Sequence, residues 1–208
     1  MKYFLIVTIA ILALSCSQQQ PEQAQTDFCS QIHRNDSIKL SDQLKGLEAR
    51  LDTQTAVFVL EDGAGSMVSR AWLSEYAEKT MDIQYFIFSL DNVGLIACDY
   101  IVRAADRGVK VRILVDDIMV DAEIDEVLTL NAHENIEIKI YNPGVNLGKN
   151  ILGKIKKFAT DFRLANQRMH NKTFTVDGRV TITGGRNIAD EYFDYNREYN
   201  FRDRDVLL

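Results

Sequence analysis

The chain has 208 residues, of which 46% are hydrophobic, and a formal charge of −6 at neutral pH. This length and composition predict one globular domain with a sizeable core. The net negative charge argues against non-specific binding of nucleic acid by the whole surface, although a local basic patch is compatible with it. Three cysteines, Cys16, Cys29 and Cys98, are too few and too scattered for a disulfide scaffold or a zinc site. No pattern in the chain requires a metal or another cofactor.

The first 29 residues are expected to lie outside the folded domain. Residues 1–16 combine one lysine, an apolar run and a small residue before Cys16, which predicts a secretory signal peptide. Their end, ALSC, resembles a bacterial lipobox, so we expect an exported protein that is lipid-anchored at Cys16 in a bacterial cell envelope. An ordinary signal peptide or an uncleaved anchor is the alternative, because Ala13 replaces the commonest leucine. Residues 17–29 are polar and rich in glutamine, which predicts a tether.

Helical and strand patterns alternate through the first part of the domain, which we place at residues 30–208. Apolar spacing predicts a short amphipathic helix within 30–52 and a buried strand over 55–60. The predicted elements that follow are helix 67–79, strand 82–88, helix 95–107, strand 109–115, helix 121–133 and strand 136–141. This alternation predicts an α/β fold with a mixed, largely parallel sheet and helices on both faces.

Two charged features stand beside this pattern. Asp116 and Asp117 follow a predicted strand, and acidic caps at the strand end are favoured over a pair of carboxylates for acid–base chemistry. Residues 149–172 carry seven basic side chains against Asp161 alone. Their apolar residues fall mostly at helical spacing, which predicts an amphipathic helix with a cationic face. This helix either lies against anionic phospholipid or presents a solvated face over the core.

A β-hairpin is predicted near the C-terminus, where TFTV and RVTIT flank Asp177 and Gly178. His170 and Lys172 stand two residues apart at the start of its first strand, so their side chains project to the same face. The histidine is a potential nucleophile or proton carrier, and the lysine is a fixed cation.

Three further residues follow the second strand. Gly184 and Gly185 would let the backbone approach a ligand closely, and Asn187 adds an amide that can donate to an oxyanion. Together with Lys172 they predict a phosphate-binding site.

The pattern H-x-K-x4-D, followed by GGRN, resembles the HKD motif of the phospholipase D superfamily. The runs GGRNIADEYF and FRDRDVLL are similar to its bacterial cardiolipin synthase branch. MDIQYFIF and RGVKVRILVDD extend the resemblance back to about residue 60. The resemblance implies His170 as the nucleophile, and Lys172, Asp177 and Asn187 as further catalytic residues.

The resemblance also implies a carboxylate from another strand that orients the histidine. Asp205 matches this position, and Asp203 is the alternative. The family takes its leaving-group acid from the histidine of a second HKD motif, and the 208 residues contain no second H-x-K. We therefore expect either the N-terminal half of a two-motif enzyme or a pair of identical chains. A strand that stops at Leu208 favours the first arrangement.

The function implied by the resemblance is phosphatidyl transfer between phospholipids through a phosphohistidine intermediate. The expected partners are an anionic phospholipid membrane and a second HKD half. Two alternatives are open: hydrolysis of a phosphodiester, as by a phospholipase D or a nuclease, and a non-catalytic half-domain that binds membranes.

Overall fold

The computed structural model describes residues 38–116, 124–143 and 168–208. The predicted signal peptide with Cys16, the tether and most of the predicted cationic helix lie outside these ranges. Within them, no helix combines the length and the hydropathy that crossing a bilayer requires.

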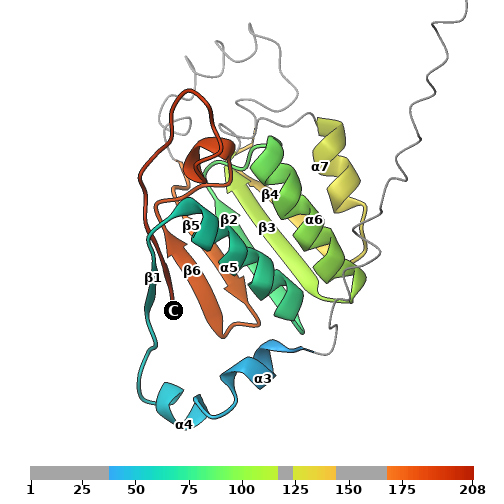
Figure 1. The fold of residues 1–208 in the computed structure, drawn as a ribbon. Helices are drawn as coiled ribbons and strands as arrows, with labels where there is room; N and C mark the ends of the chain where they lie inside the picture. The colour runs from blue at the N-terminus through green and yellow to red at the C-terminus, as the bar shows by residue number, and fades with distance from the viewer. Residues whose placement is uncertain (1–37, 117–123, 144–167) are drawn as a thin grey trace, which may run out of the picture. The chain divides into compact units, whose positions relative to one another are not determined.

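Seven strands form one mixed sheet in the order β1-β7-β6-β5-β2-β3-β4 (Figure 1). Three neighbouring strands run parallel: β2 (Thr80–Tyr85), β3 (Lys110–Asp116) and β4 (Ile136–Tyr141). The other strands pair antiparallel with their neighbours: β5 (Lys172–Val176), β6 (Val180–Gly184), β7 (Asp205–Leu207) and β1 (Phe58–Leu60). The predicted mixed α/β sheet is confirmed, and its parallel part is confined to β2, β3 and β4.

Helices α5 (Gly63–Tyr76) and α6 (Asn92–Asp106) lie side by side across one face of the sheet, and α7 (Ile124–Asn131) lies beside β4 (Figure 1). Alternate residues of β2 and β3 point to this face and form the core. On the opposite face, Gln84 and Thr173 stay half-exposed. Helical cover is therefore seen on one face in the part of the chain that the structure describes.

Both long helices begin earlier than their apolar spacing predicts, because an aspartate caps each of them. The Asp62 carboxylate accepts a hydrogen bond from the Gly65 N–H, and Asp91 accepts one from the Gly94 N–H. These caps add about one turn to the amino end of each helix.

The segment before α5 differs from the sequence prediction in two ways. The expected helix is divided into α3 (Leu40–Leu44) and α4 (Glu48–Leu51), since Gly46 between them has a φ of 90°. The expected buried strand over 55–60 shortens to β1, an edge strand in which Phe58 is 65% exposed and Leu60 is 4% exposed. The apolar run was a poor guide to burial here, because an edge strand directs only part of its side chains into the core.

The predicted hairpin is confirmed, and Asp177 anchors its turn. Asp177 and Gly178 have φ angles of 53° and 65°. The Asp177 carboxylate accepts hydrogen bonds from the backbone N–H groups of Glu78, Lys79 and Thr80, at 2.9, 2.7 and 2.9 Å. The turn of the hairpin is thereby joined to the start of β2.

We expect Asp177→Ala to lower the free energy of unfolding by about 2 kcal/mol, because hydrogen bonds to a charged acceptor contribute about 1.5–3 kcal/mol. Asp177→Asn tolerates the positive φ and keeps one acceptor oxygen, so its loss should be smaller. Urea denaturation of the three proteins measures both differences. Equal stability of the native protein and the alanine variant would contradict this role.

Candidate functional site

The pairing of β5 with β2 sets the position of the candidate site. The two strands run antiparallel with Tyr85 opposite Lys172. Residues just before β5 therefore meet residues just after β2, at the carboxyl ends of the parallel strands, where ligands of open α/β sheets usually bind. The His170 ring contacts the Phe86 ring there, with centroids 4.9 Å apart.

His170 and Lys172 lie together, as their spacing predicts. Lys172 Nζ is 3.3 Å from His170 Nε2 and donates a hydrogen bond to the His170 carbonyl oxygen at 3.2 Å. Lys172 is only 7% exposed, whereas His170 is exposed. Burial lowers the pKa of the Lys172 amine, and the negative charge of Asp203 opposes this shift. The pair thus combines an accessible imidazole nitrogen with a cation held beside it.

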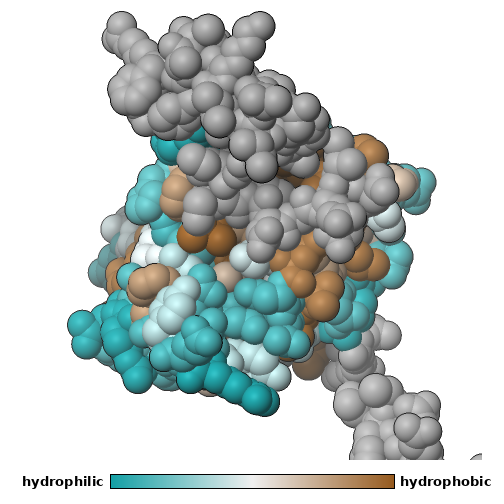
Figure 2. Space-filling model, turned by 90° about the horizontal axis from the view of Figure 1, so that it is seen from above, coloured by the Kyte–Doolittle hydropathy of each residue, from teal (hydrophilic) through white to brown (hydrophobic). Residues whose placement is uncertain are grey.

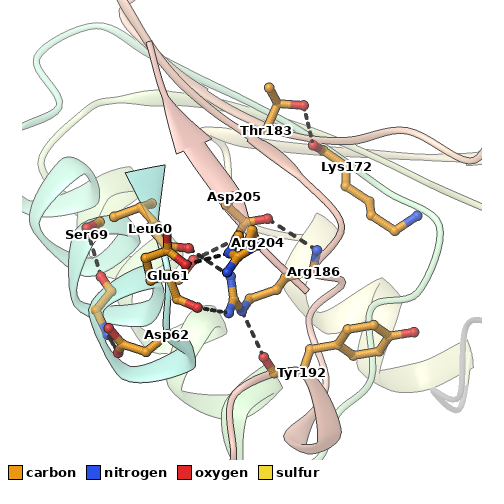
Figure 3. Close-up of polar contacts among 12 residues, drawn as sticks. Leu60, Glu61, Asp62, Ser69, Lys172, Thr183, Arg186, Tyr192, Arg204 and Asp205 are labelled. Carbon is orange, nitrogen blue, oxygen red and sulfur yellow. Dashed lines mark hydrogen bonds and ion pairs between the residues drawn. The ribbon is translucent and has the colours of Figure 1, made fainter. Parts of the chain in front are cut away.

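Neighbouring strands hold this pair in place. The Thr183 hydroxyl on β6 donates to the Lys172 carbonyl oxygen at 3.0 Å. Figure 3 shows the Lys172 side chain extending away from the cluster around Asp205 and Arg186. The amine of Lys172 is also 5.6 Å from the centre of the Phe86 ring, within the range of a cation–π contact.

Asn187 is buried beside the same segment. Its Oδ1 accepts a hydrogen bond from the Ile87 N–H at 3.0 Å, which fixes the orientation of the amide. Burial raises the pKa of the Tyr192 hydroxyl, and a hydrogen bond with the Asn187 side chain opposes the shift. A hydrogen bond that favours the ionised tyrosine is donated by the amide nitrogen of Asn187, whose second N–H can donate toward an oxyanion.

The two glycines of GGRN make close contacts with the chain rather than opening a ligand site. A Cβ added to Gly184 would lie 2.4 Å from both the Arg204 carbonyl oxygen and an Asp205 carboxylate oxygen. A Cβ on Gly185 would lie 2.4 Å from an oxygen of Asp203, and the Gly185 N–H donates to the Arg204 carbonyl. The structure therefore assigns Gly184 and Gly185 to packing against the segment that enters β7.

Asp205 is fully buried in a network that does not include His170. Its carboxylate accepts hydrogen bonds from the Ser66 hydroxyl at 2.6 Å and from Arg70 Nη2 at 2.9 Å. It also accepts one from the Arg186 N–H at 3.2 Å (Figure 3). Burial alone would raise the pKa of Asp205, but the charge of Arg70 and these hydrogen bonds hold it below its usual value. These hydrogen bonds give Asp205 a structural role, and none of them joins it to His170.

Asp177 is likewise not brought to the site. It follows His170 by seven residues along an extended strand, so the two α-carbons are separated by on the order of 20 Å. Asp203, the alternative to Asp205, lies nearer to the chemistry, since its charge acts on Lys172. Of Asp203 and Asp205, the two candidates for the orienting carboxylate, Asp203 therefore interacts electrostatically with Lys172.

The motif did not indicate two residues that shape the site. Phe86 packs on His170, and Asp116 is fully buried at the end of β3. The Asp116 carboxylate accepts hydrogen bonds from the Met169 N–H at 2.9 Å and from Arg168 Nη1 at 3.1 Å. The interpretation of Asp116 as a strand-end cap agrees with this geometry, because it holds the segment just before His170. Phe86 was recognisable only once the register of β2 and β5 was known.

We expect Asp205→Ala to lower the free energy of unfolding by about 3–5 kcal/mol, because it leaves the Arg70 guanidinium buried without a counter-charge. Because the pKa of Asp205 is lowered in the folded protein, its contribution is present at neutral pH and is lost as the pH falls below the ordinary carboxyl range. Thermal unfolding at neutral and acidic pH measures both effects. A difference between the native and variant proteins that does not shrink in acid would contradict this assignment.

Comparison with known proteins gives related sequences and folds. Residues 74–206 match the family described as cardiolipin synthase, PLD-like domain. Cardiolipin synthase C of Escherichia coli is 42% identical over 154 residues, which are 74% of this chain and 32% of that protein. An uncharacterised protein of Helicobacter pylori is 39% identical over 154 residues, which are 30% of its length. The chain thus spans about a third of the curated relatives that it matches.

Solved structures share the fold at low sequence identity. Phosphatidylserine synthase of Haemophilus influenzae superposes with a TM-score of 0.53 at 15% identity, over 73% of this chain and 32% of that one. NucT of Helicobacter pylori superposes with a TM-score of 0.51 at 17% identity, over 73% and 82%. The family match covers most of the described domain, including the segment with His170 and Lys172, and the chain belongs to the cardiolipin synthase group of phospholipase D-like domains.

Proposed function

We propose that this chain carries one half of a phosphatidyltransferase site, in which His170 is the nucleophile. The observation that carries the proposal is the 3.3 Å separation between His170 Nε2 and Lys172 Nζ. A nucleophilic nitrogen and a fixed cation at this distance can engage the phosphorus and an anionic oxygen of one phosphodiester.

The reaction divides into two displacements. His170 Nε2 attacks phosphorus, a P–N bond forms, and the P–O bond to the leaving alcohol breaks with its electron pair on oxygen. That oxygen takes a proton from a second acid. The hydroxyl of an acceptor then attacks phosphorus and gives its proton to the conjugate base of the second acid, while the P–N bond breaks with its electron pair on His170 Nε2. Lys172 and the Asn187 amide would stabilise the negative oxygens in both steps.

The second acid belongs to the partner half in this proposal. The chain holds one H-x-K and spans about a third of the relatives that it matches. A second histidine would come either from a further part of a longer protein or from a second copy of this chain. Both arrangements place it opposite His170, where it protonates the leaving oxygen.

A lipid substrate is favoured by the surface near this end of the sheet. Leu95 and Ile96, in the first turn of α6, are exposed, as is Leu128 on α7. Seen from above, hydrophobic residues gather on one part of the surface beside hydrophilic ones (Figure 2). An apolar surface next to a phosphate site suits a phospholipid in a bilayer, and the net charge of −6 disfavours nucleic acid.

His170→Ala tests the nucleophile in the intact protein. With vesicles of labelled phosphatidylglycerol and both halves of the site present, we expect the native protein to form cardiolipin and an acid-labile phosphoryl adduct, and the variant to form neither. His133→Ala is the matched control, because His133 contacts Asp106, the last residue of α6, rather than the segment with Lys172. Phosphatidic acid in place of cardiolipin would indicate hydrolysis, and vesicle binding without product from either protein would indicate a non-catalytic domain. Turnover that survives His170→Ala would overturn the mechanism.

The pH dependence of turnover tests Lys172. Because burial lowers the pKa of its amine, we expect the alkaline limb of kcat/KM to lie below the ordinary lysine value of about 10.4. The charge of Asp203 raises the pKa of Lys172, so Asp203→Asn should move this limb to still lower pH. A pH–rate profile of both proteins measures the shift. An unchanged or higher limb in the variant would show that Asp203 does not act on Lys172.

A further inference from the structure

One edge of the Arg168 guanidinium has no hydrogen-bond acceptor in the described part of the chain. Its Nη1 pairs with Asp116 at 3.1 Å, and its side chain is only 14% exposed. Its other two nitrogens, Nε and Nη2, are buried, and no hydrogen-bond acceptor is found for them in the part of the chain that the structure describes. Buried donors without acceptors cost stability, so a pair of them on one side chain calls for a ligand.

These two nitrogens lie on the same edge of the guanidinium plane. The same edge of Arg112 binds a carboxylate through two hydrogen bonds. Its Nε and Nη2 donate to the two carboxylate oxygens of Asp82 at 2.5 and 2.8 Å. The same paired geometry matches two oxygens of a phosphate. Arg168 therefore presents a complete bidentate edge for an oxyanion, while its third nitrogen is held by Asp116.

Arg168 is close to the proposed nucleophile along the chain. Arg168 precedes His170 by two residues, so their α-carbons are at most about 7 Å apart. The Asp116 carboxylate binds both Arg168 and the Met169 N–H, which keeps this short segment in one conformation. Lys172 serves the phosphate attacked by His170, and Arg168 is available for another.

We propose that the Nε and Nη2 edge of Arg168 is a second phosphate subsite, which holds the phosphate of the acceptor lipid during transfer. This inference rests on the proposed phosphatidyltransferase function and adds to it. The product of transfer carries two phosphates joined through one glycerol, so an acceptor phosphate must lie near the reacting one. Binding it would place the acceptor hydroxyl next to the phosphohistidine.

A direct test follows the Nε–H nuclear magnetic resonance signals of arginine in the intact protein. The Arg168 signal is assigned by its loss in Arg168→Lys. Added inorganic phosphate should shift it, in the native protein and in Lys172→Ala, and phosphatidylglycerol micelles should shift it likewise if the phosphate of a lipid reaches the same edge. The Arg112 signal is the control, because Asp82 already occupies that edge and the signal should stay unchanged.

Two results of this titration would overturn the subsite. One is an Arg168 signal that neither phosphate nor lipid changes. The other is a signal that already has the position of a carboxylate-bound guanidinium and loses it in Asp117→Asn, which would make the neighbouring aspartate the occupant. A shift with inorganic phosphate alone would restrict the subsite to free phosphate and contradict the acceptor role.

Acceptor choice provides the second test. With phosphatidylglycerol as donor, Arg168→Lys should reduce transfer to a second phosphatidylglycerol by about tenfold or more, because it loses a bidentate charged contact. Exchange of labelled free glycerol, an acceptor without phosphate, should change little, and Arg112→Lys should alter neither reaction. Equal loss with both acceptors would assign Arg168 to positioning of His170 instead. Absence of transfer by a native protein that contains both halves of the site would refute the proposed function, whereas the resonance titration would still decide whether Arg168 binds an anion.

Discussion

The antiparallel pairing of β5 with β2 is the constraint on which the site depends. It places Lys172 opposite Tyr85, and so brings His170 beside Phe86 at the carboxyl ends of the parallel strands. A shift of one residue would turn Lys172 to the other face of the sheet and change which residues of β2 lie opposite the segment with His170. Asp177 secures the far end of this pairing through three backbone N–H groups at the start of β2. The histidine and the aspartate of the HKD motif thus lie at opposite ends of the pairing between β5 and β2.

A second buried carboxylate, that of Asp205, holds the backbone segment that leads to Asn187. Asp205 joins α5, through Ser66 and Arg70, to the backbone of Arg186. The Arg186 guanidinium in turn donates to the carbonyl oxygens of Leu60 and Tyr192. Because Asn187 follows Arg186 directly, this network fixes the segment that carries the candidate oxyanion donor. An acid that the motif spacing associates with catalysis acts here by holding the backbone.

Much of this arrangement could be predicted from local sequence, and the rest depends on contacts between distant segments. The hairpin and the shared side of His170 and Lys172 follow from residue types and the two-residue period of a strand. The partners of Asp177 and Asp205 do not follow from spacing, since Glu78 lies 99 residues from Asp177 and Ser66 lies 139 residues from Asp205 along the chain. The prediction that residues 55–60 form a buried strand was wrong for the same reason. Whether a strand lies at the edge or in the middle of a sheet depends on its neighbours and not on its own sequence.

The charges around His170 are balanced by carboxylates. Lys172 experiences the charge of Asp203, and Arg168 is paired with Asp116. Asp203 favours the protonated lysine in a buried place, and Asp116 orients the guanidinium, but each carboxylate also reduces the attraction for an anionic substrate. Weaker attraction for the ground state is compatible with fast transfer, because binding the ground state and the transition state equally does not raise kcat. The balance therefore suits the proposed transfer, in which one phosphodiester is taken up from a membrane and another is released to it.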